Sequence, residues 1–100
     1  MRVIAEVQFS PIGTATPSVS TYVRAGLAVL DQHPDVTYQI GAMGTVLEGE
    51  RAAVLAAVEA MNAAIFAAGA QRVGTALKID ERHDKPTSAQ HKVDAVQRET

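Results

Sequence analysis

The order in which two hydrophobic periodicities follow one another along these 100 residues constrains the fold more than any other feature. Apolar and polar residues first alternate, and apolar residues then recur every three or four positions. Two further alternating segments, a second segment with the wider spacing and a last alternating segment follow. Alternation is typical of a strand with one buried face, and the wider spacing is typical of an amphipathic helix. We therefore predict the order strand–helix–strand–strand–helix–strand.

Residues that begin or end regular structure separate these segments. Thr16-Pro17 is predicted to start the first helix, because threonine can cap free amide groups and proline suits the first helical position. Pro34 ends that helix, since the residue before a proline avoids the helical conformation, and Gly69 suits a left-handed cap after the second helix. The predicted elements are strands over 1–9, 36–40, 45–48 and 72–80, a helix from Thr16 to Pro34, a hairpin turn over 41–44 and a long helix from Gly49 to Gly69.

This order predicts one α+β domain over residues 1–100 with a ferredoxin-like βαββαβ arrangement. Such a domain is a four-stranded antiparallel sheet with both helices on one face, and the chain length suits a single domain. Residues 81–100 form a charged tail, in which Ala89, Val93 and Val96 have the spacing of a short amphipathic helix.

Composition limits the classes of function. The chain has no cysteine, which excludes disulfides and thiolate metal sites, and its three histidines lack the spacing of a metal site. A net charge of −2 argues against a nucleic-acid partner. No apolar run reaches the roughly 20 residues that span a membrane, and Glu6 comes too early for a signal-peptide core. We expect a cytoplasmic protein with no nucleic-acid, membrane or metal partner.

The sheet face turned away from the two helices is predicted to be uncovered in a single subunit. Small and apolar residues occupy its middle, among them Ile4, Val46, Gly74 and Ala76. Much of the 47% apolar content is alanine, which buries little surface per residue. We therefore expect a homodimer or homotetramer in which a second sheet packs on this face.

Strand threonines are the most informative polar residues. If Tyr38 faces the helices, the partner strand turns Thr45 the same way, and Thr75 has the same parity on the last strand. A hydroxyl between sheet and helices needs a partner, because an unpaired buried one costs about 1–3 kcal/mol. Each threonine either bonds nearby backbone or lines a small ligand pocket. The candidate lining residues are Ser18, Ser20, Tyr38, Met43 and Thr45.

Two charged features each admit two interpretations. Glu48, at the end of the third strand, is either a carboxylate favoured by a helix N-terminus or an acceptor and counter-charge for a cationic ligand. Residues 80–85 form the densest charge cluster. They are either a solvated surface with weak ion pairs or a salt-bridge network between subunits.

Several stretches, taken in order, resemble one known family. They are residues 10–13, 18–23 and 43–49 and the charged segments between 72 and 93. Together they are similar to the small single-domain thiamine-binding proteins over nearly the whole chain. The resemblance implies a ferredoxin-like subunit, assembly into dimers and tetramers, and binding of thiamine or its hydroxymethylpyrimidine moiety without catalysis or a cofactor. The alanine run in the second helix departs from this pattern.

Thiamine combines a flat aminopyrimidine with a cationic thiazolium ring. A carboxylate can accept from the exocyclic amine or balance the cation, hydroxyls can bond the ring nitrogens, and aromatic or thioether groups offer polarizable contact. The residues that the resemblance implies at the ligand are Ser18, Ser20, Tyr38, Met43, Thr45 and Glu48. Two other functions stay open: an oligomeric regulatory or assembly module, and a small cofactor-free enzyme with Glu48 as its acid or base.

Overall fold

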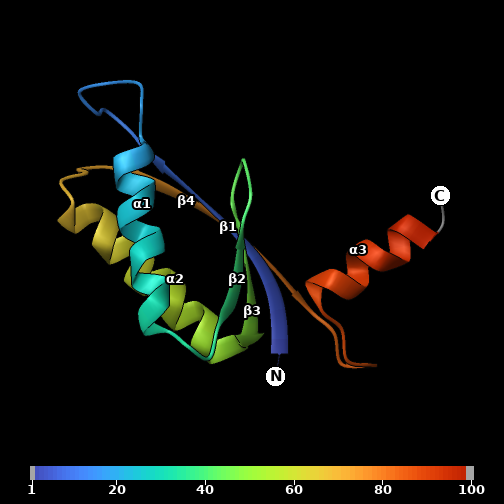
Figure 1. Ribbon diagram of the computed structural model, residues 1–100. Coiled ribbons are helices and arrows are strands. Elements are labelled where there is room, and N and C mark those ends of the chain that lie inside the picture. The colour runs from blue at the N-terminus through green and yellow to red at the C-terminus, as the bar shows by residue number, and fades with distance from the viewer. Residues whose placement is uncertain (1, 99–100) are drawn as a thin grey trace.

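The computed structural model describes residues 2–98, and its strands form one antiparallel sheet in the order β2-β3-β1-β4 (Figure 1). The elements are β1 (Arg2–Pro11), α1 (Ser20–Ala28), the 3-10 helix η1 (Val29–Gln32), β2 (Thr37–Ile40), β3 (Thr45–Glu50), α2 (Arg51–Ala67), β4 (Val73–Glu81) and α3 (Ala89–Arg98). The predicted α+β class and βαββαβ order are confirmed. Met1 and residues 99–100, assigned above to the first strand and the tail, lie outside the described residues.

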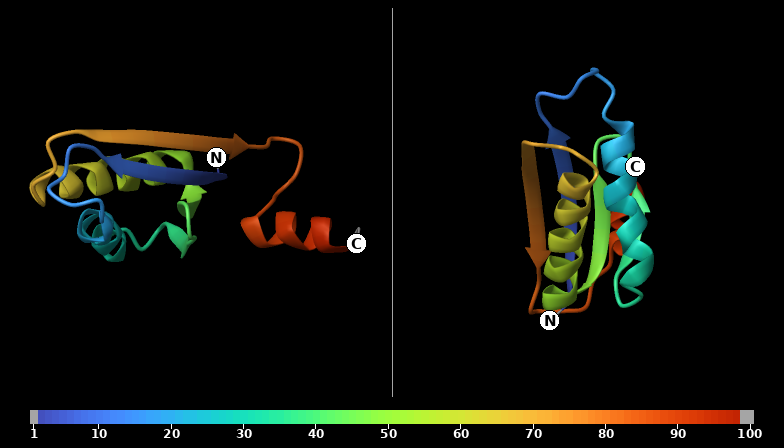
Figure 2. Two further views of the ribbon diagram at one scale, coloured as in Figure 1. Left: turned by 90° about the horizontal axis from the view of Figure 1, so that it is seen from above. Right: turned by 90° about the vertical axis from the view of Figure 1, so that its left-hand side faces the viewer.

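The strand register turns a continuous apolar surface toward α1 and α2. Val7 lies opposite Thr45 and Ala5 lies opposite Leu47, and residues opposite each other on paired strands share one face of the sheet. Both α1 and α2 lie on this face (Figure 2). The buried apolar residues are Val3, Ala5, Val7, Leu30, Val36, Leu47, Val54, Ala57, Val58, Met61, Ile65 and Ala70.

Glycine residues allow α1 to pack closely against α2 and allow the chain to turn after α2. A Cβ atom on Gly26 of α1 would lie 3.1 Å from Cδ1 of Ile65 on α2, so glycine permits the close approach. Gly69 has a φ of 116°, which confirms the predicted left-handed residue after α2.

Several predicted boundaries were wrong. The long helix α2 begins at Arg51 and not at Gly49, because Gly49 and Glu50 continue β3. Helix α1 begins at Ser20 and not at Thr16-Pro17. The hydroxyl of Thr14 donates to the carbonyl of Thr16, and that of Thr16 donates to the carbonyl of Ser18. Such local bonds favour turns over helix.

The first strand also extends to Pro11, whereas it was predicted to stop at Phe9. Beyond Val7, β1 pairs only with β4. A proline is tolerated at such a strand end, because its missing N–H interrupts no central ladder.

Strand β2 forms one edge of the sheet. Tyr38 lies opposite Leu47 and Ile40 lies opposite Thr45, so both have the predicted parity toward the helices. Both side chains are nevertheless exposed, because no further strand flanks β2.

Helix α3 lies on the side of the sheet opposite to α1 and α2 (Figures 1 and 2). It confirms the short amphipathic helix predicted around Ala89, Val93 and Val96. Within residues 2–98, no helix has both the length and the apolar content that crossing a bilayer requires.

Candidate functional site

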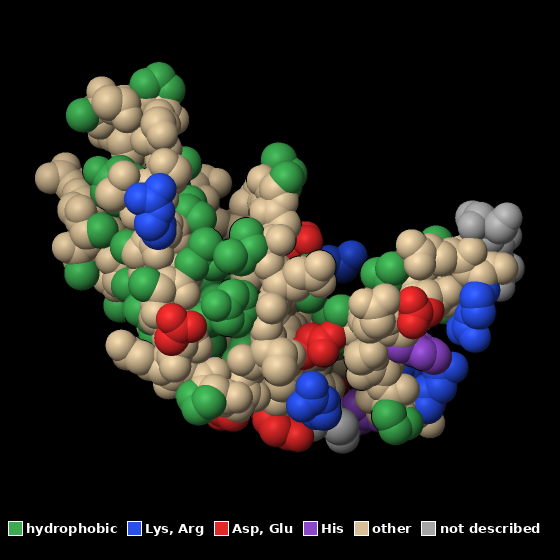
Figure 3. All heavy atoms as spheres, in the orientation of Figure 1, with side chains coloured by type: hydrophobic (Ala, Val, Ile, Leu, Met, Phe, Trp, Pro, Cys, Tyr) green, Lys and Arg blue, Asp and Glu red, His purple; other side chains and the backbone are tan. Residues whose placement is uncertain are grey.

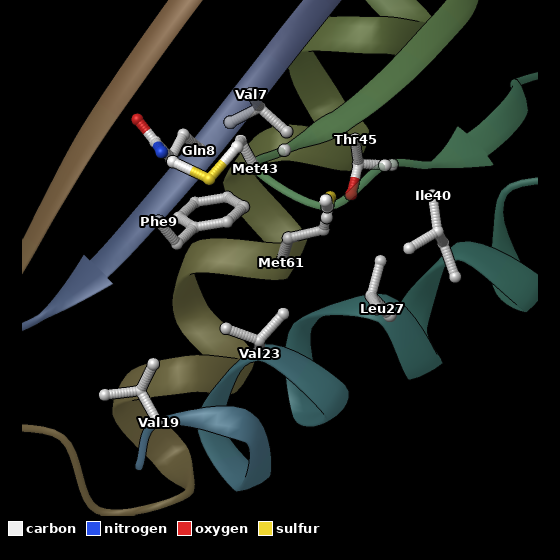
Figure 4. A pocket seen from close by; sticks show the side chains of 13 residues that line it. Val7, Gln8, Phe9, Val19, Val23, Leu27, Ile40, Met43, Thr45 and Met61 are labelled. Carbon is white, nitrogen blue, oxygen red and sulfur yellow. The ribbon is translucent and has the colours of Figure 1, made fainter. Parts of the chain in front are cut away.

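A cavity of about 230 Å³ opens between α1, the end of β1 and the β2–β3 hairpin (Figure 4). Helix α1 contributes apolar side chains from one face, β1 contributes Phe9, and α2 contributes Met61. The full lining is Val7, Gln8, Phe9, Val19, Val23, Leu27, Ile40, Gly41, Ala42, Met43, Gly44, Thr45 and Met61. This lining contains no charged side chain, so the cavity suits a neutral and largely apolar group.

The hairpin that forms one wall depends on glycine. The N–H of Gly41 donates to the carbonyl of Gly44 at 2.8 Å, which closes the turn. A Cβ atom on Gly44 would lie 2.9 Å from the carbonyl oxygen of Val7, a distance too short for a side chain. The close approach of the β2–β3 hairpin to β1 therefore requires glycine at position 44. Met43, at the tip, is 77% exposed and lies at the mouth of the cavity.

Thr45 is the buried polar residue of this cavity. It is 6% exposed and lines the cavity. Among the described residues, the buried side-chain oxygen without a hydrogen-bond partner is Oγ1 of Thr87 and not the hydroxyl of Thr45. Figure 4 shows the hydroxyl oxygen turned toward Met61, among apolar side chains. A hydroxyl that lines a cavity can donate a hydrogen bond to a bound group or accept one from it. The largely apolar lining thus includes two polar side chains, Thr45 and Gln8.

The other strand threonine has a different environment. Thr75 donates to Oδ1 of Asn62 on α2 at 3.3 Å, which agrees with the predicted parity toward the helices. It lies on the edge strand β4 and outside the cavity lining.

The six residues expected at a ligand do not form one cluster. Met43 and Thr45 line the cavity together. Ser18 and Ser20 flank Val19, which lines it, but both are exposed and their hydroxyl oxygens lie 3.5 Å apart. Ser18 and Ser20 therefore lie near the start of α1, beside the cavity but outside its lining.

Tyr38 and Glu48 belong to a second cavity of about 170 Å³, which also involves Gln39, Val46 and the start of α3. Glu48 pairs with Ile4 and Thr37 in the register, which places it on the outer face of the sheet, away from Thr45. Its carboxylate accepts a hydrogen bond from the backbone N–H of Ala89. Glu48 is thus a helix-start carboxylate, as one interpretation held, but it serves α3 and not α2.

Sequence reasoning missed the apolar lining residues other than Met43, among them Phe9, Val23, Leu27 and Met61. Phe9 has the inward parity of β1, and Val23 and Leu27 belong to the apolar stripe of α1, so each was identified as a core residue and not as part of a cavity. Met61 was placed on the apolar stripe of the long helix in the same way. Periodicity indicates which face is apolar, but the separation of α1 from the hairpin decides whether that face is filled.

The charge cluster at residues 80–85 forms ion pairs within the chain. The guanidinium of Arg82 contacts both carboxylate oxygens of Asp84, at 2.6 and 2.7 Å, and lowers the pKa of Asp84 to about 2. A hydrogen bond from Lys92 of α3 likewise lowers the pKa of Asp80. The bond between His83 and Glu81, at 2.7 Å, is the main cause of the lowered pKa of Glu81. The pair between Asp80 and Lys92 joins the end of β4 to α3. The pair between Glu81 and His83 joins the end of β4 to the loop before α3.

The described part of the chain holds no group of three or more histidine, cysteine or carboxylate side chains arranged to bind a metal ion.

Comparison with known proteins identifies the family. The profile of the family described as thiamine-binding protein matches residues 5–97. The chain belongs to this family. UPF0045 protein YqgV of Bacillus subtilis, one of its relatives, is 40% identical over 96 residues, which cover 93% of this chain and 92% of that protein. The description of the family names binding of a ligand and no catalysed reaction.

Solved structures of related proteins share the architecture. Hypothetical protein MJ1052 from Methanocaldococcus jannaschii superposes with a TM-score of 0.87 at 36% identity, over 96% of both chains. A candidate thiamine biosynthesis/salvage protein from Thermotoga maritima has a TM-score of 0.79 over 96% of this chain and 99% of its own, at 18% identity. At that identity the second likeness establishes the fold alone.

Proposed function

We propose that this member of the thiamine-binding protein family is a non-catalytic carrier whose α1–hairpin cavity holds the hydroxymethylpyrimidine half of thiamine. The observation that supports the proposal is the hydroxyl of Thr45 in the lining of a largely apolar cavity without charged side chains. This hydroxyl can bond a ring nitrogen or the exocyclic amine of a pyrimidine.

The size of the cavity favours a fragment over the whole vitamin. Sites for drug-sized ligands usually measure about 300–1,000 Å³, and this one measures about 230 Å³. One substituted pyrimidine ring suits that space, with Phe9 and Met61 supplying aromatic and thioether contacts. The thiazolium ring of thiamine then extends past Met43 into solvent.

The charge of the lining supports the same orientation. A thiazolium cation inside the cavity would meet no carboxylate, and burying an unpaired charge is costly. The neutral aminopyrimidine avoids that cost. Glu48, the carboxylate expected to balance the cation, lies on the other side of the sheet.

The lining also bears on the rival functions. A cofactor-free enzyme needs an acid or base at its reacting atoms, and the 13 lining residues include none. An assembly module needs no cavity between sheet and helices. We propose that assembly into a homodimer or homotetramer accompanies ligand binding and does not replace it.

Calorimetric titration tests the proposal. Purified protein is titrated with hydroxymethylpyrimidine, thiamine and thiamine phosphates, in parallel with the variants Thr45→Val and Thr75→Val. We expect saturable binding of roughly micromolar affinity or tighter, weakened at least about tenfold by Thr45→Val and unchanged in the matched control Thr75→Val. Similar affinities for hydroxymethylpyrimidine and thiamine would support an orientation in which the pyrimidine ring lies in the cavity and the thiazolium ring lies in solvent.

Absence of heat, together with absence of thermal stabilisation at high ligand excess, would remove the carrier function. Any ligand that binds only the native state must raise its stability. The assembly module would then be the better interpretation.

A further inference from the structure

A buried hydroxyl in the loop between β4 and α3 lacks a partner. Oγ1 of Thr87 is shielded from solvent and forms no hydrogen bond within residues 2–98. The hydroxyl of its neighbour Ser88, by contrast, accepts a hydrogen bond from the backbone N–H of His91 at 3.0 Å. Buried hydroxyls in native proteins are normally paired, and an unpaired one is a frequent sign of a missing water or ion.

Thr87 lines a cavity of about 510 Å³ at the opposite end of β1 from the α1–hairpin cavity. The other walls are the start of β1, the end of β3 and the loop over residues 82–86, and the two cavities share no lining residue. Thr87 as a whole is partly exposed, although its hydroxyl oxygen is not. A rotation about χ1 to another staggered position can therefore turn the hydroxyl toward the cavity.

Positive charge exceeds negative charge around this cavity, although the whole chain has a net charge of −2. The basic lining residues are Arg2, Arg82 and Lys85, and the acidic ones are Glu50 and Asp84. The guanidinium of Arg82 occupies the carboxylate of Asp84, at 2.6 and 2.7 Å, and Glu50 also has a partner. Arg2 and Lys85 form no ion pair within the described part of the chain. Two cations are thus left to meet a bound anion.

The loop that carries most of these groups is held in place. Arg82 and Asp84 pair across one residue, His83 bonds the carboxylate of Glu81 at 2.7 Å, and Pro86 fixes one backbone angle. Arg82 uses Nε and Nη2 for Asp84, which leaves Nη1 for another acceptor. In Figure 3, basic and histidine side chains lie along the lower edge of the molecule, below α3. A site that is already ordered loses less entropy when a ligand binds.

We propose that this cavity binds a phosphate monoester, with the phosphate group between Arg2, Lys85 and the hydroxyl of Thr87. Guanidinium and ammonium groups form charge-assisted hydrogen bonds to phosphate oxygens, and the hydroxyl gains the partner that it lacks. The volume of about 510 Å³ lies within the range of about 300–1,000 Å³ for small-molecule sites and exceeds what a bare phosphate ion fills. Ile4 and Pro86 offer apolar contact to the organic part of the ester.

Calorimetric titration with glycerol 3-phosphate tests the site, with glycerol as the uncharged control and inorganic phosphate as the competing source of the same group. We expect the ester to bind with submillimolar affinity, inorganic phosphate to bind more weakly and glycerol not to bind. Added salt should weaken binding, because it screens the charges. Absence of heat and of thermal stabilisation by glycerol 3-phosphate would overturn the proposal. Equal affinity for inorganic phosphate would overturn the assignment to an ester.

Substitutions test where the phosphate group lies. Arg2→Gln and Lys85→Gln are each expected to weaken binding of glycerol 3-phosphate about fivefold or more. The matched control is Arg24→Gln, at an exposed position of α1 outside the cavity. Thr87→Val should also weaken binding, and it should raise the unfolding temperature of the ligand-free protein because it removes an unpaired buried hydroxyl. Thr87→Ser keeps the hydroxyl and should restore binding. Binding that Arg2→Gln, Lys85→Gln and Thr87→Val all leave intact contradicts the proposed site.

The two cavities can be tested independently. Thr45→Val changes only the α1–hairpin cavity, so the affinity for glycerol 3-phosphate should stay unchanged. Lys85→Gln should likewise leave the affinity for hydroxymethylpyrimidine unchanged. Failure of the phosphate site would therefore be distinguishable from failure of the carrier function, and loss of glycerol 3-phosphate binding in Thr45→Val would contradict a separate site.

Discussion

The carboxylate of Glu48 in β3 accepts a hydrogen bond from the backbone N–H of Ala89, the first residue of α3. The bond joins two residues 41 positions apart and fixes the start of α3 over the outer face of the sheet. It satisfies one of the amide groups that a helix N-terminus leaves free, and a negative charge is favourable at that end of the helix dipole.

Replacing Glu48 is expected to loosen α3 without affecting the cavity. Glu48→Ala removes the acceptor, and loss of a capping acceptor typically costs about 1 kcal/mol. Hydrogen exchange over residues 89–98 should accelerate, while calorimetric affinity for hydroxymethylpyrimidine stays unchanged. Glu48→Gln keeps an acceptor oxygen and is expected to restore most of the protection. Loss of ligand affinity in Glu48→Ala would instead place the carboxylate at the ligand.

Thr45→Val is expected to weaken ligand binding with little effect on the ligand-free protein. The substitution keeps the shape of the side chain and removes a hydroxyl that lines the cavity and is not a buried unpaired group. The free energy of unfolding from urea titration should therefore change by less than about 1 kcal/mol. Thr75→Val, which loses the hydrogen bond to Asn62, is the control and should leave the ligand affinity unchanged. An unchanged ligand affinity in Thr45→Val would contradict a contact between this hydroxyl and the ligand.

Gly44→Ala is expected to destabilise the hairpin that walls the cavity. The added Cβ would lie 2.9 Å from the carbonyl oxygen of Val7, so the hairpin must move away from β1. Steric insertions of this kind cost about 1–3 kcal/mol, which thermal unfolding will register. Ala42→Ser, at an exposed position in the same turn, is the control and should leave the unfolding temperature nearly unchanged.

The pair between Arg82 and Asp84 predicts a specific acid titration. The guanidinium lowers the pKa of Asp84 from 3.8 to about 2, so the stabilisation from the pair is present above pH 3.8 and is lost as pH falls through about 2. Carboxyl NMR titration should show this midpoint, and Arg82→Ala should raise it toward the ordinary value. Lys85→Ala should raise it less, because Lys85 contributes less to the shift than Arg82 does. An unchanged midpoint in Arg82→Ala would assign the shift to another cause.

Local sequence determined which segments are regular and how they follow one another. Alternation in β1, β3 and β4 and the apolar stripe of α2 are properties of neighbouring residues, so the βαββαβ order and the parity of Thr45 and Thr75 were predictable. The start of α1 was not, because the hydroxyls of Thr14 and Thr16 bond the local backbone.

Contacts between distant segments decided the candidate site. Phe9 and Met61 lie far apart in the chain, and only the packing of β1, α1 and α2 brings them into one cavity with Thr45. Glu48 follows Thr45 by three residues, and the odd separation along a strand turns it to the opposite face. The family resemblance nevertheless implied Glu48 and Thr45 at one ligand, although the alternation alone sets them on opposite faces. Only the tertiary structure showed that the carboxylate meets Ala89 of α3 on the outer face.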